Sequence, residues 1–247
     1  MVLRASHGDL GVDEHLIGDG RWQRVLEALR QEPYMHPTYL GRLRRFVVLR
    51  RNCTWAKIGL WNRLLQRSQP VAGLNLLHIE STAIKCHRTA TGAHGSGEEA
   101  IGRSRGGLST KVHHASQFAS HNCGDSLGFV RRLLTSHGQH ADCRHAAALT
   151  GGLKPVAVVA DKAYDTDTLR GHWGAQGISN CVPSKCNRLV QHAYNEALYR
   201  TRHMVENSFC HLKDHARLSL RLDKTETSFR AFAALLINLK LKPKLCN

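Results

Sequence analysis

The stretch KPVAVVADKAYD, residues 154–165, is a short apolar run that ends in an acid. A run of this length, rich in Val and bounded by Pro, is typical of a buried strand that leads into a turn. Residues 165–177 have the pattern of a short helix with Asp165 or Thr166 as its N-cap, and residues 178–185 have that of another strand. Strands that alternate with helices predict a layered α/β domain.

Three further strands are predicted upstream, where short apolar runs lie between turn signals, and they cover residues 74–82, 108–116 and 127–136. Between the first and the second of them lies a Gly-rich basic loop, residues 91–107. Its backbone amides, together with Arg103 and Arg105, can hold phosphate. A flexible hairpin connection explains the same composition nearly as well.

The first 70 residues differ in pattern from the rest of the chain. Residues 21–32 have helical spacing, and residues 42–67 continue as one or two basic helices. Helices of this kind can bind DNA as a helix-turn-helix variant, and a solvated helical face is an equally good interpretation. We therefore expect two domains, a helical N-terminal region of residues 1–70 and an α/β domain of residues 71–247.

The charge of the chain indicates a polyanionic partner. Its 247 residues include 35 Lys and Arg against 19 Asp and Glu, which gives a formal net charge of +16. Nucleic acid is the leading candidate for the partner of such a chain. No apolar run reaches the roughly 18 residues of a membrane span, and the start of the chain lacks the apolar centre of a signal peptide. We expect a cytoplasmic protein associated with the nucleoid.

LYRTRHMVENSFCHLK, residues 198–213, has the spacing of a long helix with an ordered polar stripe. At about 100° per residue, four polar side chains project within one narrow sector of this helix: Tyr199, Arg202, Glu206 and Lys213. An ordinary surface helix scatters its charges outside the apolar face, so the stripe indicates a function. A row of spaced salt bridges, with Arg202 and Glu206 as an i,i+4 pair, is the simpler alternative.

Three acids lie where metal-dependent phosphodiester chemistry needs them. Two divalent ions about 4 Å apart neutralise the charge that develops in such a reaction, and carboxylates are their preferred ligands. Glu80 ends the first predicted strand, Asp161 ends the apolar run 154–165, and Glu206 lies on the polar stripe. Each acid also has a plainer interpretation: a solvent-facing strand terminus, a turn or cap residue, and a partner of Arg202, respectively.

These residues resemble the DDE transposases of bacterial insertion sequences, specifically the group whose third acid lies in the pattern Tyr, two residues, Arg, three residues, Glu, six residues, Lys. The pattern is reproduced without a gap by Tyr199, Arg202, Glu206 and Lys213. Residues 160–170 are similar to the second-acid motif of this family, and residues 101–113 to the stretch that follows its first acid. Residues 216–235 are similar to its closing segment.

The resemblance implies a ribonuclease-H-like core with a mixed sheet, and an enzyme that cleaves and transfers DNA strands. The implied catalytic residues, which also bind the metal, are Glu80, Asp161 and Glu206. The implied cofactor is Mg²⁺ or Mn²⁺, as a pair of ions. The DNA-binding residues in this interpretation are Tyr199, Arg202, Lys213, Lys162, Arg103 and Arg105. The implied partners are double-stranded DNA, both the terminal inverted repeats of a transposon and its target, and a second copy of the chain in a homodimer on DNA.

Glu80 departs from the family, which has Asp at this position. An extra methylene moves the carboxylate by about an ångström, and a shift of that size can cost on the order of 100-fold in rate. The alternative function is therefore a degenerate transposase that binds DNA but is catalytically impaired. A ribonuclease-H-like nuclease without strand transfer and a zinc-dependent DNA-binding module are further alternatives.

Overall fold

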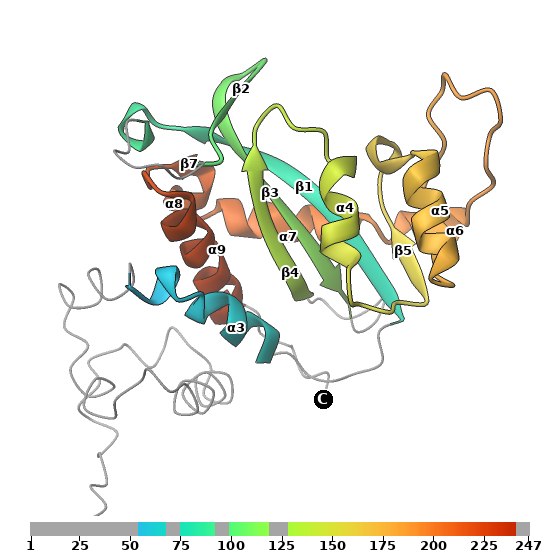
Figure 1. Ribbon diagram of the computed structural model, residues 1–247, viewed down its shortest axis with the longest axis horizontal. Helices are drawn as coiled ribbons and strands as arrows, with labels where there is room; N and C mark the ends of the chain where they lie inside the picture. Colours follow the sequence, from blue (N-terminus) through green and yellow to red (C-terminus); the bar gives the residue numbers. More distant parts are fainter. Residues whose placement is uncertain (1–53, 68–74, 92–98, 119–127, 241–247) are drawn as a thin grey trace, which may run out of the picture.

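The computed structural model describes residues 54–67, 75–91, 99–118 and 128–240, which form a mixed sheet with helices on both faces (Figure 1). The strands are β1 (Leu76–Cys86), β2 (Gly102–Ser104), β3 (Gly107–Gln117), β4 (Phe129–His137), β5 (Ala157–Val159), β6 (Ser179–Cys181) and β7 (Leu220–Arg221). The helices are α3 (Leu60–Arg67), α4 (Cys143–Thr150), α5 (Asp167–Ala175), α6 (Glu196–Arg200), α7 (His203–Lys213), α8 (Ala216–Ser219) and α9 (Glu226–Lys240), with 3₁₀ turns η4 (Arg88–Ala90) and η5 (Lys162–Tyr164).

The order and direction of the strands define the class of fold. β3 pairs antiparallel with β1 and with β4, whereas β5 pairs parallel with β1, and β6 parallel with β5. The sequence β4-β3-β1-β5-β6 across the sheet is that of a ribonuclease-H-like core. The short strands extend this core, because β2 pairs with the start of β3 and β7 with the end of β1. The predicted fold class, α/β with a mixed sheet, is therefore confirmed.

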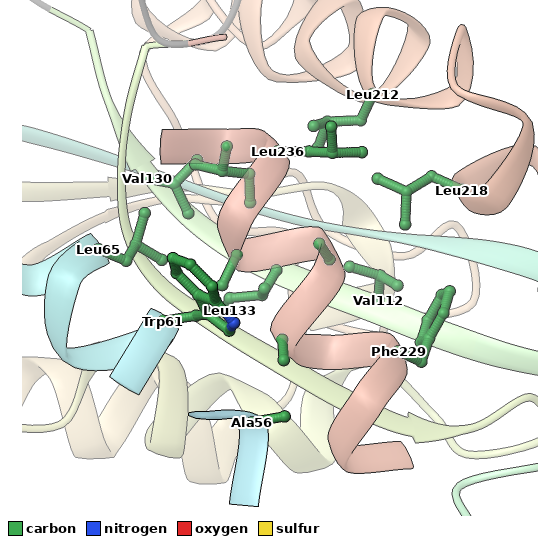
Figure 2. Packing of buried hydrophobic residues seen from close by; sticks show 14 of the residues in the cluster. Ala56, Trp61, Leu65, Val112, Val130, Leu133, Leu212, Leu218, Phe229 and Leu236 are labelled. Atoms are coloured by element: carbon green, nitrogen blue, oxygen red, sulfur yellow. The ribbon is translucent and has the colours of Figure 1, made fainter. Parts of the chain in front are cut away.

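One face of the sheet is covered by α3, α7, α8 and α9. Ile84 of β1 and Val112 of β3 point to this face and belong to its buried apolar cluster. Figure 2 shows Trp61 of α3 and Phe229 of α9 turned toward the same layer. Fully burying a large apolar side chain contributes about 1.5–3 kcal/mol, so this cluster holds the covering helices on the sheet.

The opposite face of the sheet is covered by α4 and α5. Leu77 and Ile79 of β1 and Val158 of β5 pack there against Leu149 and Trp173. β5 lies between two strands and its three residues are buried, which explains the short apolar run in the sequence. The strands on both sides of α5 are parallel, as in other strand-helix-strand units.

The described residues before position 70 share a core with the α/β domain. α3 packs against α9 and β4, and Leu60 and Leu64 are buried in the cluster that contains Phe229. The boundary at residue 70 stays a prediction. The predicted helix at 21–32 and the first part of the basic segment 42–67 lie outside the described residues.

The predicted helix of residues 198–213 is two helices, α6 and α7, with a tight turn between them. Around the junction the amides of Thr201 and Arg202 donate to the carbonyls of Leu198 and Tyr199, three residues back instead of four. The turn has a tertiary cause, because the hydroxyl of Thr201 lies 2.7 Å from Nε2 of the buried His78 in β1. The prediction of one continuous helix is therefore wrong at this point.

In the part of the chain that the structure describes, no helix is both long and apolar enough to span a bilayer.

Candidate active site

The register of β1 and β5 brings two of the predicted acids to adjacent positions. The last pair in this parallel ladder joins His78 to Val159, and Glu80 and Asp161 each follow two residues later. Side chains alternate between faces with a period of two, so both acids point to the face on which His78 lies, under α7. Neighbouring strands are about 4.8 Å apart, which places the two carboxyl groups in one region.

Glu80 lies in the middle of β1, because the strand continues to Cys86. Its side chain is only 12% exposed. The prediction that Glu80 ends a strand is wrong, and it is not a solvent-facing terminus. The reason is the cover from α7: His114, the cross-strand neighbour of Glu80, is fully buried, and its ring centroid lies 4.0 Å from that of Phe209.

Arg202 connects the first acid to the third. Its Nη2 lies 2.9 Å from Oε2 of Glu80, and its Nη1 donates to Oε1 of Glu206 at 2.5 Å. The expected i,i+4 ion pair with Glu206 is thus formed, and the same guanidinium also reaches the strand. Arg202 stands at the start of α7, where the turn after Thr201 directs it toward the sheet. Glu206 is half exposed, with 50% of its side chain accessible to solvent.

Asp161 follows β5 directly and caps the 3₁₀ turn η5. Its Oδ1 accepts a hydrogen bond from the amide of Ala163 at 2.9 Å. The plainer interpretation, that Asp161 is a cap residue, is therefore correct for this oxygen. Burial nevertheless raises the pKa of Asp161, and the amide of Ala163 and the charge of Arg202 only partly oppose this rise.

Burial and the neighbouring acids make Glu80 the most perturbed carboxyl group of the site. Burial raises the pKa of Glu80 to about 7, against the opposing charge of Arg202, and the charges of Asp161 and Glu206 add to the rise. Burial lowers the pKa of Arg202, but Glu80 and Glu206 outweigh this and raise it overall. A carboxyl group that is costly to ionise next to other acids is typical of a site that receives a cation.

The acids of the site supply the type of ligand atom that a divalent cation prefers. Carboxylate oxygens are the ligands that Mg²⁺ and Mn²⁺ prefer, and Oε2 of Glu80 is buried, with Nη2 of Arg202 at 2.9 Å. Over those same residues, no three His, Cys, Asp or Glu side chains are gathered closely enough to hold a metal ion as they stand. The guanidinium of Arg202 explains this, because it lies between Glu80 and Glu206. A cation bound by both glutamates would have to displace it.

Three of the predicted DNA-binding residues lie beside the acids. The guanidinium carbon of Arg202 lies 5.9 Å from the centre of the Tyr199 ring. Lys162 follows Asp161 directly, at the start of η5. Arg202 therefore contacts two of the acids directly, and Lys162 is the neighbour of the third in the chain.

The other three predicted DNA-binding residues lie farther from the acids. Lys213 is the last residue of α7, about 10 Å along the helix axis from Glu206 at 1.5 Å per residue. Arg103 and Arg105 are exposed on the hairpin that joins β2 to β3, in which Gly107 has a φ of +96°. The predicted hairpin connection is therefore present in the described part of the Gly-rich loop, whereas residues 92–98 lie outside it.

Sequence reasoning missed a second ion pair close to the site. Nζ of Lys111 in β3 lies 2.8 Å from Oδ1 of Asp142 and donates to the carbonyl of His140 at 2.8 Å. The charge of Asp142 contributes to the raised pKa of Asp161. The two partners are 31 residues apart, so no local spacing could have indicated the pair.

Comparison with known proteins identifies similar chains. Residues 73–241 match the family model described as transposase DDE domain. The chain is 37% identical over 114 residues to a Brucella ovis protein named as a candidate transposase for insertion sequence element IS6501, an overlap of 45% of this chain and 87% of that protein. A piggyBac transposase synaptic complex with hairpin DNA is a structural neighbour at a TM-score of 0.45 and 9% identity. That overlap covers 90% of this chain and 63% of the length of the neighbour.

Proposed function

The chain belongs to the transposase DDE domain family, and from this membership and the acid site we propose that it cleaves and transfers DNA strands in a metal-dependent reaction. The observation that carries the proposal is the contact of Arg202 with both Glu80 and Glu206, next to the strand end that Asp161 follows. The register of β1 and β5 supports a common site for Glu80 and Asp161, and the guanidinium of Arg202 links Glu80 to Glu206. A site of this kind on a chain with a net charge of +16 is suited to a phosphodiester substrate.

In this proposal Glu80, Asp161 and Glu206 hold Mg²⁺ or Mn²⁺. A pair of such ions, when bound, neutralises the charge that develops between the attacking and the leaving oxygen. Arg202 has two roles: it compensates the acids in the absence of DNA, and it turns to a phosphate when DNA and metal are bound. The raised pKa of Glu80, about 7, supports a carboxyl group that ionises fully only beside a bound cation.

Four residues along α6 and α7 support a finer assignment within the family. Tyr199, Arg202, Glu206 and Lys213 have the spacing of the group with the Tyr-Arg-Glu-Lys motif. We assign the chain to that group. Tyr199, Arg202 and Lys213 bind the transposon end, and Lys162, Arg103 and Arg105 bind phosphates of the same duplex. The partners are the terminal inverted repeats and target DNA, bound by a homodimer, because transposition joins two ends.

A catalytically impaired, DNA-binding relic is the second candidate, and two observations favour it. Glu80 is longer by one methylene than the Asp of the family, and its carboxylate is already paired with Arg202. Both features make it harder to place a metal ion correctly. DNA contacts through the basic residues do not depend on either feature.

The test is Mn²⁺-dependent nicking of a plasmid that carries the terminal repeats of the element. The unmodified chain, Glu206→Gln and Glu80→Asp are compared. We expect the unmodified chain to nick, Glu206→Gln to lose nicking, and Glu80→Asp to nick faster, because the shorter carboxylate restores the geometry of the family. Nicking by Glu80→Asp alone would support the relic, and equal nicking by Glu206→Gln would refute the acid site.

A further inference from the structure

The loop between β6 and α6, residues 182–195, presents two adjacent apolar side chains to solvent. Leu189 is 101% exposed and Val190 is 68% exposed. In Figure 1 this loop projects from the body of the molecule beyond α5 and α6. Exposed single apolar residues are ordinary, whereas an adjacent pair on a projecting loop indicates a contact with another molecule.

The base of this loop is held by a buried carboxylate. Oδ2 of Asp165 accepts hydrogen bonds from the amide of Lys185 at 2.9 Å and from Nε of Arg188 at 3.0 Å, while Oδ1 accepts from Nε of Arg170 at 2.8 Å. Burial alone would raise the pKa of Asp165, but these donors hold it at about 2. Asp165 is therefore ionised throughout the physiological range and fixes the start of the loop.

The two arms of the loop are also tied to each other on either side of the apolar pair. The amide of His192 donates to Oγ of Ser184 at 2.8 Å. Nε2 of Gln191 donates to the carbonyls of Lys185 and Arg188 at 3.2 and 2.8 Å. Ordering these residues costs conformational entropy, and no apolar burial at the tip offsets that cost. A tip ordered in this way is preorganised to meet a partner.

A chain of contacts leads from the loop to the acids. The ring of Tyr194, at the end of the loop, lies edge to face with that of Tyr199 at 5.4 Å between centroids. Arg202 lies 5.9 Å from the Tyr199 ring, and its guanidinium pairs with Glu80. DNA that is held at the acids would therefore extend along Tyr199 and Tyr194 to the loop.

We propose that Leu189 and Val190 form a wedge that enters a base step of the duplex bound at the acids. Apolar side chains that enter the minor groove beside cationic groups unstack one step and kink the DNA. Lys185 lines the same hollow as Leu189 and Val190, which has a volume of about 470 Å³. Asp165 and Asp167 also line this hollow, and Arg188 pairs with both of them. The net charge of +16 of the whole chain favours DNA over an apolar protein surface. The inference rests on the proposed function, because it requires a bound duplex.

The experiment uses the full chain and a duplex that contains a terminal repeat of the element, with 2-aminopurine placed in turn at each base around the transposon boundary. We expect the fluorescence of 2-aminopurine to rise several-fold at one step, because unstacking relieves its quenching. The double variant Leu189→Ser/Val190→Ser should bind the duplex within about 3-fold of the original affinity, since phosphate contacts dominate binding, yet lose the rise. Val156→Ser, at a residue that is 63% exposed before the start of β5, is the matched control and should keep the rise.

The outcomes separate the wedge from the function on which it rests. Binding without a rise at any step overturns the wedge and leaves the proposed function intact. A rise in fluorescence that persists in the double variant also overturns the wedge. If the oligomeric mass of the double variant changes while its rise in fluorescence persists, Leu189 and Val190 belong to a protein interface instead. A chain that binds no duplex, measured by anisotropy at low salt, overturns the proposed function and the wedge together.

Discussion

Replacing Leu64 with Ala tests whether α3 belongs to the same core as the acid site. Leu64 is 0% exposed and lies in the cluster with Val112 of β3 and Phe229 of α9. A buried Leu→Ala change removes transfer free energy and leaves a cavity, which together cost about 3–5 kcal/mol. We expect the free energy of unfolding to fall by about 3 kcal/mol, and the thermal midpoint by about 6–12 °C for a chain of this size.

The assay for this change is urea unfolding, monitored both by tryptophan fluorescence and by far-UV circular dichroism. The ring centroids of Trp55 and Trp61 lie 5.5 Å apart in this region, and in a background in which Trp22 and Trp173 are replaced by Phe their fluorescence reports on α3, whereas circular dichroism reports on the whole domain. The control is Leu222→Ala, at a residue that is 45% exposed, which should change the free energy of unfolding by less than about 0.5 kcal/mol. An equally small effect of Leu64→Ala, or a fluorescence transition separate from that of the domain, would refute the shared core and favour an independent N-terminal domain.

Two further predictions concern acid stability and DNA binding. Burial is the main cause that lowers the pKa of His113 from 6.5 to about 4 and the pKa of His114 from 6.5 to about 3. The unfolded chain therefore binds more protons, and the stabilising contribution of each His, present above pH 6.5, falls by roughly 3 kcal/mol as the pH drops to 4. A urea midpoint that is flat between pH 7 and 5 would contradict this. For DNA, the double variant Arg103→Ala/Arg105→Ala should reduce the slope of log affinity against log salt by about 2, since each phosphate contact contributes about 0.9. Arg144→Ala, at an exposed residue of α4, should leave the slope unchanged, and an unchanged slope in the double variant would remove both arginines from the DNA contact.

The strands and the short helix were predictable because their signals are local. The apolar run before Asp161 is short and rich in Val, as a strand buried on both faces requires, and β5 lies there. α5 begins after Thr166, which is one of the two predicted N-cap residues. The hydroxyl of Thr166 accepts a hydrogen bond from the amide of Leu169 at 3.3 Å. Such features depend on neighbours in the sequence and can be found without a structure.

The features that the sequence did not indicate depend on residues far apart in the chain. The break between α6 and α7 follows from the contact of Thr201 with His78, which lies 123 residues away. The burial of Glu80 in mid-strand was missed because His78 and His114 make this face of the sheet polar, yet α7 covers it. The spacing of Arg202 and Glu206 predicted their ion pair, but it gave no indication that the same guanidinium reaches Glu80.

The measurement that tests the central claim most directly is the affinity of the free protein for Mn²⁺. Binding is measured by calorimetry and by the electron paramagnetic resonance signal of unbound Mn²⁺. Glu80→Gln, Asp161→Asn and Glu206→Gln are compared with the control Glu196→Gln, an exposed acid in the first turn of α6. If the three acids form one site, each of the three variants should weaken Mn²⁺ binding by at least about 10-fold, the loss expected when a ligand is removed, and the control should bind as the original chain does. Mn²⁺ affinity that is the same in all four variants would contradict a common metal site at Glu80, Asp161 and Glu206.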